Sequence, residues 1–216
     1  MSDTAPLYAA LGVIVLSGTI IDLLWTTIWA EGGSGPLTTR LMSGLWNPLR
    51  RATSRESQLL TLAGPLILVA SLATWIALLW LGWTLVFAGS ETAVIATSSQ
   101  SAASWVERFY FVGYSLFTLG NGGFSPKGGV WQIATVLMTA SGMLVVTLLV
   151  TYVLSVLGAV TQKKLFASTV SGLGRRSEEI VAAGWNGEQF DDFDLPLNTI
   201  TTELNRLTVN HMAYPV

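Results

Sequence analysis

Three long apolar runs dominate the pattern of hydrophobic and polar positions along this chain. They cover residues 7–30, 59–88 and 130–160. Each run is longer than the ~20 residues that an α-helix needs to cross a hydrocarbon core of ~30 Å. The pattern therefore predicts three membrane-spanning helices. The first is expected to be a retained helix rather than a cleaved signal, because the residues before it include no Lys or Arg.

A shorter apolar segment, residues 105–117, lies between the second and third runs. As a helix it would extend about 20 Å, which is too short to cross the membrane. It contains Glu107 and Arg108 and is followed by a glycine-rich stretch. Irregular backbone is tolerated at membrane depth only where protein or a water-filled cavity surrounds it. These features predict a re-entrant helix that enters the membrane and returns.

The polar segments are expected to form connections and a tail. Residues 31–58 form a linker. Within it, the spacing of apolar residues over 38–51 fits an amphipathic helix on the inner membrane surface. The alternative is a solvated loop with a few apolar residues. Residues 89–104 are small and polar, so a loop is expected there. In the tail, 161–216, a helix is expected over 197–211. The apolar face of this helix, which suggests a bundle between copies of the chain, consists of Ile200, Leu204, Leu207 and His211.

Basic residues are distributed unequally among these segments. The positive-inside rule places connections rich in Lys and Arg in the cytoplasm. The segment between the second and third spans contains only two basic residues, Arg108 and Lys127. The basic residues of the linker and of the start of the tail are Arg40, Arg50, Arg51, Arg55, Lys163, Lys164, Arg175 and Arg176. A multi-pass protein of the cell membrane is therefore predicted, with its N-terminus outside and its C-terminus in the cytoplasm.

The composition limits the classes of function. Charged residues make up 11% of the chain, against about 25% in an ordinary soluble domain. There is no Cys and a single His, so thiolate catalysis, cysteine metal sites and histidine-based catalysis lack their residues. No basic stripe indicates nucleic acid. We therefore expect no enzyme activity, no cofactor and no nucleic-acid partner, and we expect the lipid bilayer as the surroundings.

One acidic residue, Asp22, lies within the first apolar run. A charge at the centre of a span costs roughly 2.5–3.5 kcal/mol on insertion scales. The side chain is expected either to face the helix bundle close to one end of the span, or to contact another helix and influence a pore.

The segment between the re-entrant helix and the third span has the composition of an ion filter. Gly120 and Gly122 lack a Cβ and can adopt positive φ, so successive carbonyl groups can turn toward one line. Rings of such carbonyls can replace the water around a cation. One chain offers too few oxygens to surround an ion, so several copies around an axis are required. The predicted filter residues are Thr118, Leu119, Gly120, Asn121 and Gly122. Monovalent cations are expected at the first four of them.

The sequence of residues 110–126, YFVGYSLFTLGNGGFSP, resembles the pore segment of the potassium-channel superfamily of tetrameric cation channels. That family has an aromatic-rich pore helix, a T-V-G-Y-G-D filter and a trailing proline. The matching positions, with Leu in place of Val, are Thr118, Leu119, Gly120, Gly122 and Pro126. The resemblance covers residues 59 to about 160. It implies an all-α membrane fold with a span, a pore helix, a filter and a second span. In this chain an additional span within 1–30 precedes that unit. The resemblance also implies that the chain assembles as a homotetramer.

Two positions depart from the family's pattern. Asn121 stands where the family has Tyr or Phe, and Gly123 stands where it has Asp. The family's aromatic packs against pore-helix aromatics and helps to hold the filter diameter, so other groups must support this filter. The candidates for that support are Tyr110, Phe111, Tyr114 and Gly123. Selectivity for K⁺ over Na⁺ is therefore open at this stage.

Gly142 lies 24 residues after Thr118, where members of the family often carry a hinge glycine on the inner helix. A glycine in a helix interior permits bending. Within the sequence Ala-Ser-Gly it can equally serve close packing between helices. Both interpretations, a gating hinge and a packing contact, are open.

Together these inferences predict a passive, homotetrameric, potassium-conducting cation channel with K⁺ as the permeant ion. A weakly selective Na⁺/K⁺ channel is an alternative that Asn121 favours. The others are a subunit of a Trk-like potassium transporter and a non-conducting membrane scaffold or subunit.

Overall fold

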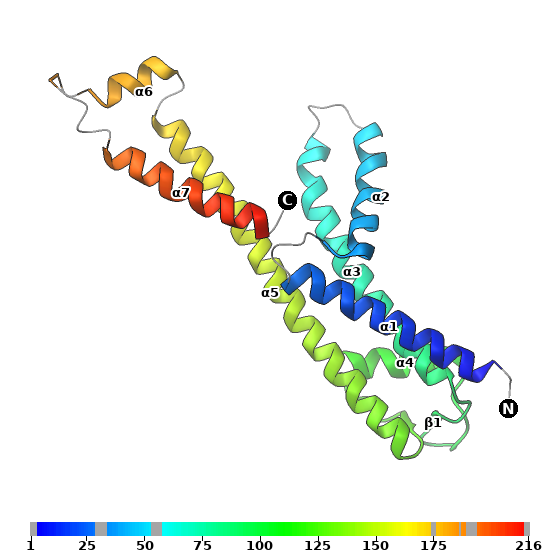
Figure 1. Ribbon diagram of the computed structural model, residues 1–216. Helices are drawn as coiled ribbons and strands as arrows, with labels where there is room; N and C mark the ends of the chain where they lie inside the picture. The colour runs from blue at the N-terminus through cyan, green and yellow to red at the C-terminus, as the bar shows by residue number, and fades with distance from the viewer. Residues whose placement is uncertain are drawn as a thin grey trace. The chain divides into compact units, whose positions relative to one another are not determined.

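Three of the described helices are long and apolar enough to cross a membrane. The computed structural model describes residues 4–28, 34–52, 58–173, 176–185, 187–188 and 194–213. The three helices are α1 (Ala5–Ile28), α3 (Gln58–Ala88), with its span over Leu66–Ala88, and α5 (Gly129–Leu173) (Figure 1). In lipid every backbone polar group needs a partner within the protein, and a helix supplies these partners from its own segment. The predicted all-α membrane fold with an additional N-terminal span is confirmed.

Helix α1 packs along α3 at very short range. A Cβ on Gly12 would lie 2.6 Å from the backbone nitrogen of Val86 and 2.7 Å from the carbonyl oxygen of Gly82. Gly82 in turn lies against the buried side chain of Leu16. Small residues that let backbones approach closely are a common means of joining helices in lipid. The first span is therefore part of the same helical unit as the second.

The carboxyl group of Asp22 joins three helices. It is fully buried, and its Oδ1 atom accepts hydrogen bonds from the backbone nitrogens of Leu37 (2.7 Å) and Thr38 (3.3 Å), in the first turn of α2 (Pro36–Ala52). Its Oδ2 atom accepts from the Thr38 hydroxyl (2.6 Å) and from the indole nitrogen of Trp75 in α3 (2.9 Å). The N-terminal end of a helix favours an acidic partner of this kind. Asp22 thus faces the helix bundle and also contacts two other helices.

Helix α2 occupies the linker segment for which the sequence allows either an amphipathic helix or a loop. The structure contains the helix. Its residue Thr38 is buried, whereas Arg40 is exposed. The position of α2 on a membrane surface stays a prediction.

The short apolar segment forms helix α4 (Trp105–Leu116), which begins with a capping box at Ser104. The Ser104 hydroxyl accepts a hydrogen bond from the Glu107 nitrogen (3.4 Å), and the Glu107 carboxylate accepts one from the Ser104 nitrogen (2.8 Å). Two N–H groups at the helix start are thereby satisfied. The hydrogen bonds with Ser104 hold the pKa of the Glu107 carboxyl below its usual value, which favours the ionised form that accepts them.

Helix α4 packs against α3 through Trp80. The Trp80 ring stacks on Phe109 with 4.5 Å between ring centroids, and its indole nitrogen donates to the Phe109 carbonyl (2.9 Å). A Cβ on Gly113 would run into the same ring. These contacts fix α4 beside the second span.

Two short strands connect the segment before α4 to the segment after it. They are β1 (Val94–Ala96) and β2 (Phe124–Pro126), and they pair antiparallel with Ala96 opposite Phe124. The β-branched residues Val94 and Ile95 favour an extended backbone. The sequence predicts only a loop over 89–104, because a strand of three residues is too short to show a periodic pattern and its partner lies far along the chain.

Arg108 attaches the preceding loop to α4. Its side chain is buried, and its Nη2 atom donates to the carbonyls of Glu91 (3.2 Å) and Ala103 (3.4 Å). The guanidinium lies over the ring of Trp105, 5.8 Å from the ring centroid. The loop that carries β1 is therefore held against the start of α4.

Helix α5 continues past residue 160, where the third apolar run ends. Residues 161–173 contain no Pro, and a helical backbone does not require apolar side chains to continue. The chain divides into two compact units: 4–28 with 34–150 form one, and the later part of α5 with α6 (Ser177–Ala183) and α7 (Asp194–Ala213) belongs to the other. The helix expected over 197–211 is present, but it begins earlier, because a proline is tolerated within a first helical turn.

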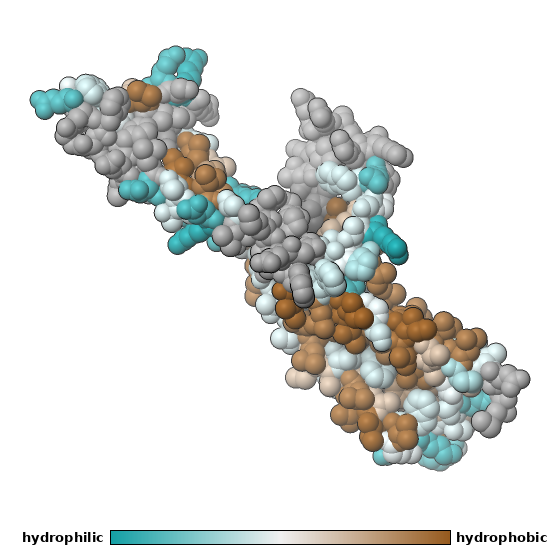
Figure 2. All heavy atoms as spheres, in the orientation of Figure 1, coloured by the Kyte–Doolittle hydropathy of each residue, from teal (hydrophilic) through white to brown (hydrophobic). Residues whose placement is uncertain are grey.

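Apolar side chains cover much of the visible surface of the first unit (Figure 2). Large exposed ones occur on each span, for example Ile14 on α1 (66% exposed), Val69 on α3 (62%) and Val136 on α5 (67%). Soluble monomers rarely expose contiguous apolar surface on this scale. The surface suits contact with lipid tails or with further copies of the chain.

Candidate functional site

The predicted filter residues form an exposed stretch at the C-terminal end of α4. The nitrogens of Thr118 and Leu119 still donate to carbonyls of that helix, at Ser115 (3.2 Å) and Tyr114 (2.8 Å), and the chain then leaves it. Thr118 and Gly120 have positive φ, 57° and 64°. In extended backbone successive carbonyls point to opposite sides, so positive φ at alternate residues turns them toward a common side. This backbone suits converging carbonyls around Thr118 and Gly120, whereas Gly122, where the sequence also allows positive φ, does not have it.

The same stretch is open to its surroundings within the described chain. Leu119 is 75% exposed. A Cβ added to Gly120 or to Gly122 would meet no described atom within 4 Å. The stretch is therefore open to an ion or to another copy of the chain around the Leu119 side chain and the Cβ positions of its two glycines.

Asn121 is held through both atoms of its amide group. Its Nδ2 atom donates to the hydroxyl of Tyr110 (2.6 Å), and its Oδ1 atom accepts from the backbone nitrogen of Gly123 (3.0 Å). Tyr110 belongs to α4 and contacts Tyr114 edge to face, with 5.3 Å between ring centroids. A hydrogen-bonded Asn–Tyr pair therefore holds the position at which the sequence departs from the family's aromatic residue.

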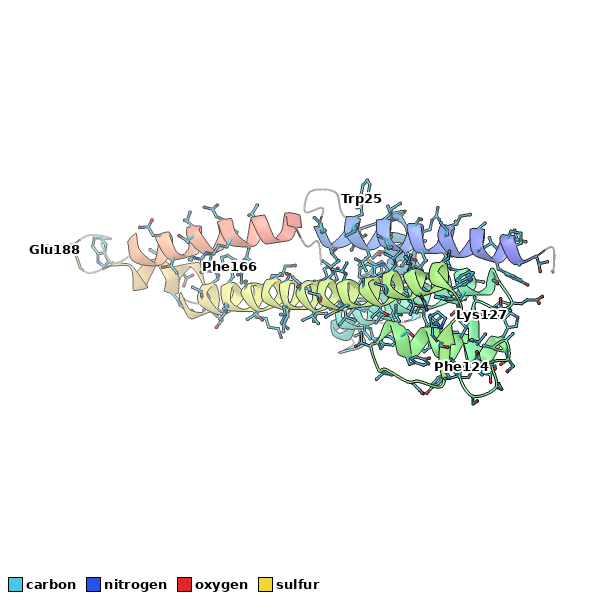
Figure 3. The ribbon with its side chains drawn as sticks, turned by 90° about the horizontal axis from the view of Figure 1, so that it is seen from below. Trp25, Phe124, Lys127, Phe166 and Glu188 are labelled. Carbon is cyan, nitrogen blue, oxygen red and sulfur yellow. The ribbon has the colours of Figure 1, made fainter. Side chains whose placement is uncertain are left out.

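Tyr114 and Phe111 connect α4 to its neighbours. The Tyr114 hydroxyl donates to the carbonyl of Phe124 in β2 (2.8 Å). Burial raises the pKa of the Tyr114 phenol, which favours the protonated form that donates this bond. Phe111 is 2% exposed and packs edge to face on Tyr114 (5.5 Å) and on Phe87 of α3 (5.3 Å). Figure 3 shows Phe124 and Lys127 in the segment that links α4 to α5.

The structure thus brings the four predicted support residues together. Tyr110 and Gly123 bond directly to the side chain of Asn121. Tyr114 and Phe111 form the next layer behind Tyr110 and against α3. Their part in holding a filter stays a prediction, since it concerns a function rather than a contact.

One residue that contacts the predicted filter is missed by the sequence analysis. Thr97 follows β1 directly, and its hydroxyl donates to the carbonyl of Gly122 (2.8 Å). Its backbone nitrogen donates to the carbonyl of Gly123 (3.0 Å). Nothing in the sequence distinguishes Thr97 from the other polar residues around it; the β-branched pair before it is the only signal of an extended segment there.

Gly142 of α5 lies against the end of α4. A Cβ at this position would run into the carbonyl oxygen of Leu116 and would lie 2.9 Å from the Cδ1 atom of that residue. Close by, the Thr139 hydroxyl donates to the carbonyl of Ser115 (3.2 Å). These contacts favour the packing interpretation of Gly142, and bending of α5 at this residue stays a prediction.

Comparisons with known proteins point to the same region. Residues 66–159 match the family described as ion channel. The chain is also similar to an uncharacterized membrane protein, YdjJ, of Bacillus subtilis (strain 168), with 44% identity over 209 residues. The alignment covers 97% of this chain and 61% of that relative, so the chain spans less than two thirds of the relative's length. No solved structure matches significantly. The region that matches the ion-channel family begins in α3 and ends in α5, and so includes α4 and the predicted filter.

Proposed function

We propose that the protein is a passive cation channel in which four copies of the chain surround one potassium-conducting pore. The match of residues 66–159 to the family described as ion channel supports this proposal. The observation that carries this proposal is the open stretch 118–122 at the end of α4, with positive φ at Thr118 and Gly120. Conduction down an electrochemical gradient needs no catalytic groups, which agrees with the composition of the chain.

The carbonyl groups of Thr118, Leu119, Gly120 and Asn121 are the proposed cation ligands. Each chain contributes one carbonyl at each level, so rings from four chains replace the hydration shell of the ion. The hydroxyl of Thr118 adds an oxygen at the inner end. Several sites of moderate affinity in series allow an ion both to enter and to leave, which conduction requires.

The open surfaces of the single chain support assembly around an axis. Leu119 is 75% exposed, and a Cβ on Gly120 or Gly122 would meet no described atom within 4 Å. Lone exposed carbonyls at membrane depth would lack partners, which is unfavourable in lipid. Copies that enclose the stretch, with ions or water between them, remove this cost.

The direction of α4 adds an electrostatic contribution. Its C-terminal end precedes the filter, and the carbonyl end of a helix carries a partial negative charge. A cation near that end gains typically about 0.3–1 kcal/mol per helix. Four such ends directed at one cavity would favour a cation there.

The proposed orientation places the filter at the outer face of the plasma membrane. Tyr8 of α1 contacts Trp105 of α4 edge to face, with 5.4 Å between ring centroids. The start of α1 and the start of α4 therefore lie at the same end of the first unit. Arg40, in α2, follows the opposite end of α1. With basic segments inside, this arrangement supports an external N-terminus and a cytoplasmic C-terminus.

A weakly selective Na⁺/K⁺ channel is the second candidate. It is favoured by Asn121, whose amide is hydrogen-bonded to Tyr110 where the family packs an aromatic ring. A hydrogen bond between two flexible side chains gives the filter less lateral packing than a buried ring would.

Potassium efflux from liposomes tests the proposed function. We expect the purified protein to release K⁺ from loaded liposomes down its gradient without any energy source. The efflux should stop when the imposed voltage equals the K⁺ equilibrium potential, because the pore is passive. Liposomes without protein are the control. Efflux that does not exceed this control would leave the scaffold interpretation in place and overturn the channel.

A further inference from the structure

Thr97 lies on a continuation of the strand pair that borders the filter. The ladder pairs Ala96 with Phe124, and the next step places Thr97 beside Gly123. The backbone nitrogen of Thr97 donates to the Gly123 carbonyl (3.0 Å), which extends the ladder by one bond. The segment after the filter is thereby anchored to the loop that precedes α4.

The Thr97 side chain reaches one residue further, into the predicted filter. Its hydroxyl donates to the carbonyl oxygen of Gly122 (2.8 Å). A carbonyl that accepts a hydrogen bond from a flanking loop is directed toward that loop. The two carbonyls that follow Asn121, at Gly122 and Gly123, are therefore both engaged by Thr97.

From these contacts we propose that Thr97 sets the outer end of the filter, by turning the Gly122 carbonyl away from the ion path. The inference rests on the proposed channel function and adds a specificity-determining residue to it. The row of carbonyls available to an ion then ends at Asn121. A cation at that level keeps water on its outer side, where a further carbonyl ring would otherwise complete the site.

The withdrawn carbonyl has a consequence for ion preference. An ion that keeps part of its water loses less hydration free energy on entry, and Na⁺ holds its water more tightly than K⁺ does. A site completed by protein oxygens discriminates against Na⁺ more strongly than a half-hydrated site does. In the completed site the protein oxygens must compensate for the loss of all the water around the ion, and this loss is larger for Na⁺. Thr97 thus lowers the affinity of the outermost site for K⁺ and lowers the preference for K⁺ over Na⁺.

The pair Thr97→Val and Thr97→Ser separates the hydroxyl from the backbone bond. Valine keeps the size and β-branching and the backbone N–H that bonds Gly123, and it removes the donor to Gly122. Serine keeps the donor and loses only the methyl group. An effect that appears in the valine variant and is absent from the serine variant therefore belongs to the hydroxyl.

The first measurement is the stabilisation of the purified protein by K⁺, read as the thermal unfolding midpoint against K⁺ concentration. An ion that binds the folded state raises this midpoint by mass action, whether or not the protein conducts. The midpoint is flat at low K⁺ and rises with the logarithm of the K⁺ concentration above the dissociation constant, so the onset of the rise measures the affinity. We expect this onset concentration to fall by about threefold in Thr97→Val. Thr97→Ser should match the wild type. A change in fold stability alone would shift the midpoint at every concentration and leave the onset concentration unchanged.

The second measurement is the K⁺/Na⁺ permeability ratio in the same variants. It should rise in Thr97→Val and stay at the wild-type value in Thr97→Ser. An unchanged or lower permeability ratio in the valine variant, or an unchanged onset concentration for K⁺ stabilisation, would overturn the role of Thr97. A wild type that shows neither K⁺ stabilisation nor flux would instead overturn the proposed channel, so the two failures are distinguishable.

Discussion

Gly120→Asp is expected to abolish potassium flux while the protein stays folded. Gly120 has a φ of +64°, and a Cβ added to it would meet no described atom within 4 Å. The substitution therefore costs only the local strain of a left-handed residue, about 1–2 kcal/mol, and no clash within the chain. In the proposed tetramer, four carboxylate side chains would meet in the narrowest part of the ion path and displace the carbonyl rings. The measurements are liposome efflux per amount of protein and the thermal unfolding midpoint.

Gly128→Asp is the matched control for this variant. Gly128 also has positive φ (+87°) and open space around it, but it lies outside the filter, directly before α5. The two variants share the strain and the added charge, so a difference in flux reports the position. Equal loss of flux in both, or normal flux in Gly120→Asp, would contradict the assignment of the filter.

Gly142→Ala is expected to destabilise the protein by about 2 kcal/mol, in spite of the better helix propensity of alanine. The added methyl would run into the carbonyl oxygen of Leu116, which is backbone and cannot rotate away. Either α5 or the end of α4 must shift, and the filter begins two residues after Leu116. We therefore expect a lower thermal unfolding midpoint together with reduced flux.

Gly158→Ala provides the comparison within the same helix. A Cβ on Gly158 would meet no described atom within 4 Å, so this variant should gain rather than lose stability, by up to about 1 kcal/mol. A glycine that served only as a hinge would behave like Gly158 in the unfolding measurement. A stabilised Gly142→Ala with altered opening would therefore favour the hinge and contradict the packing role.

The spans and the short helix could be predicted from sequence because lipid leaves the backbone few choices. An apolar run of sufficient length must form a helix, and a segment too short to cross must end inside protein. The capped start of α4 at Ser104 and Glu107 also has a sequence signature, a Ser followed three residues later by Glu. The end of α5 was less predictable, because the helix continues where the apolar pattern stops.

The polar contacts around the site could not be predicted, because their partners lie far apart in the sequence. Asp22 was recognisable as an unusual residue, but its partners in α2 and α3 follow it by 15 to 53 positions. Thr97 contacts a carbonyl 25 positions away. Such pairs depend on how the helices pack, which composition and periodicity do not encode. The pair formed by Asn121 and Tyr110 is partly predictable. The sequence indicates that other groups must support the filter at Asn121, but only the structure shows the hydrogen bond between the two side chains.

The most direct test of the central claim is the reversal potential of the wild-type protein with K⁺ on one side of the bilayer and an equal concentration of Na⁺ on the other. A filter formed by residues 118–122 that prefers potassium predicts a reversal potential displaced from zero by about 59 mV for each tenfold difference in permeability. At reversal, the compartment that contains K⁺ should be negative relative to the compartment that contains Na⁺. A reversal potential at zero would contradict potassium selectivity.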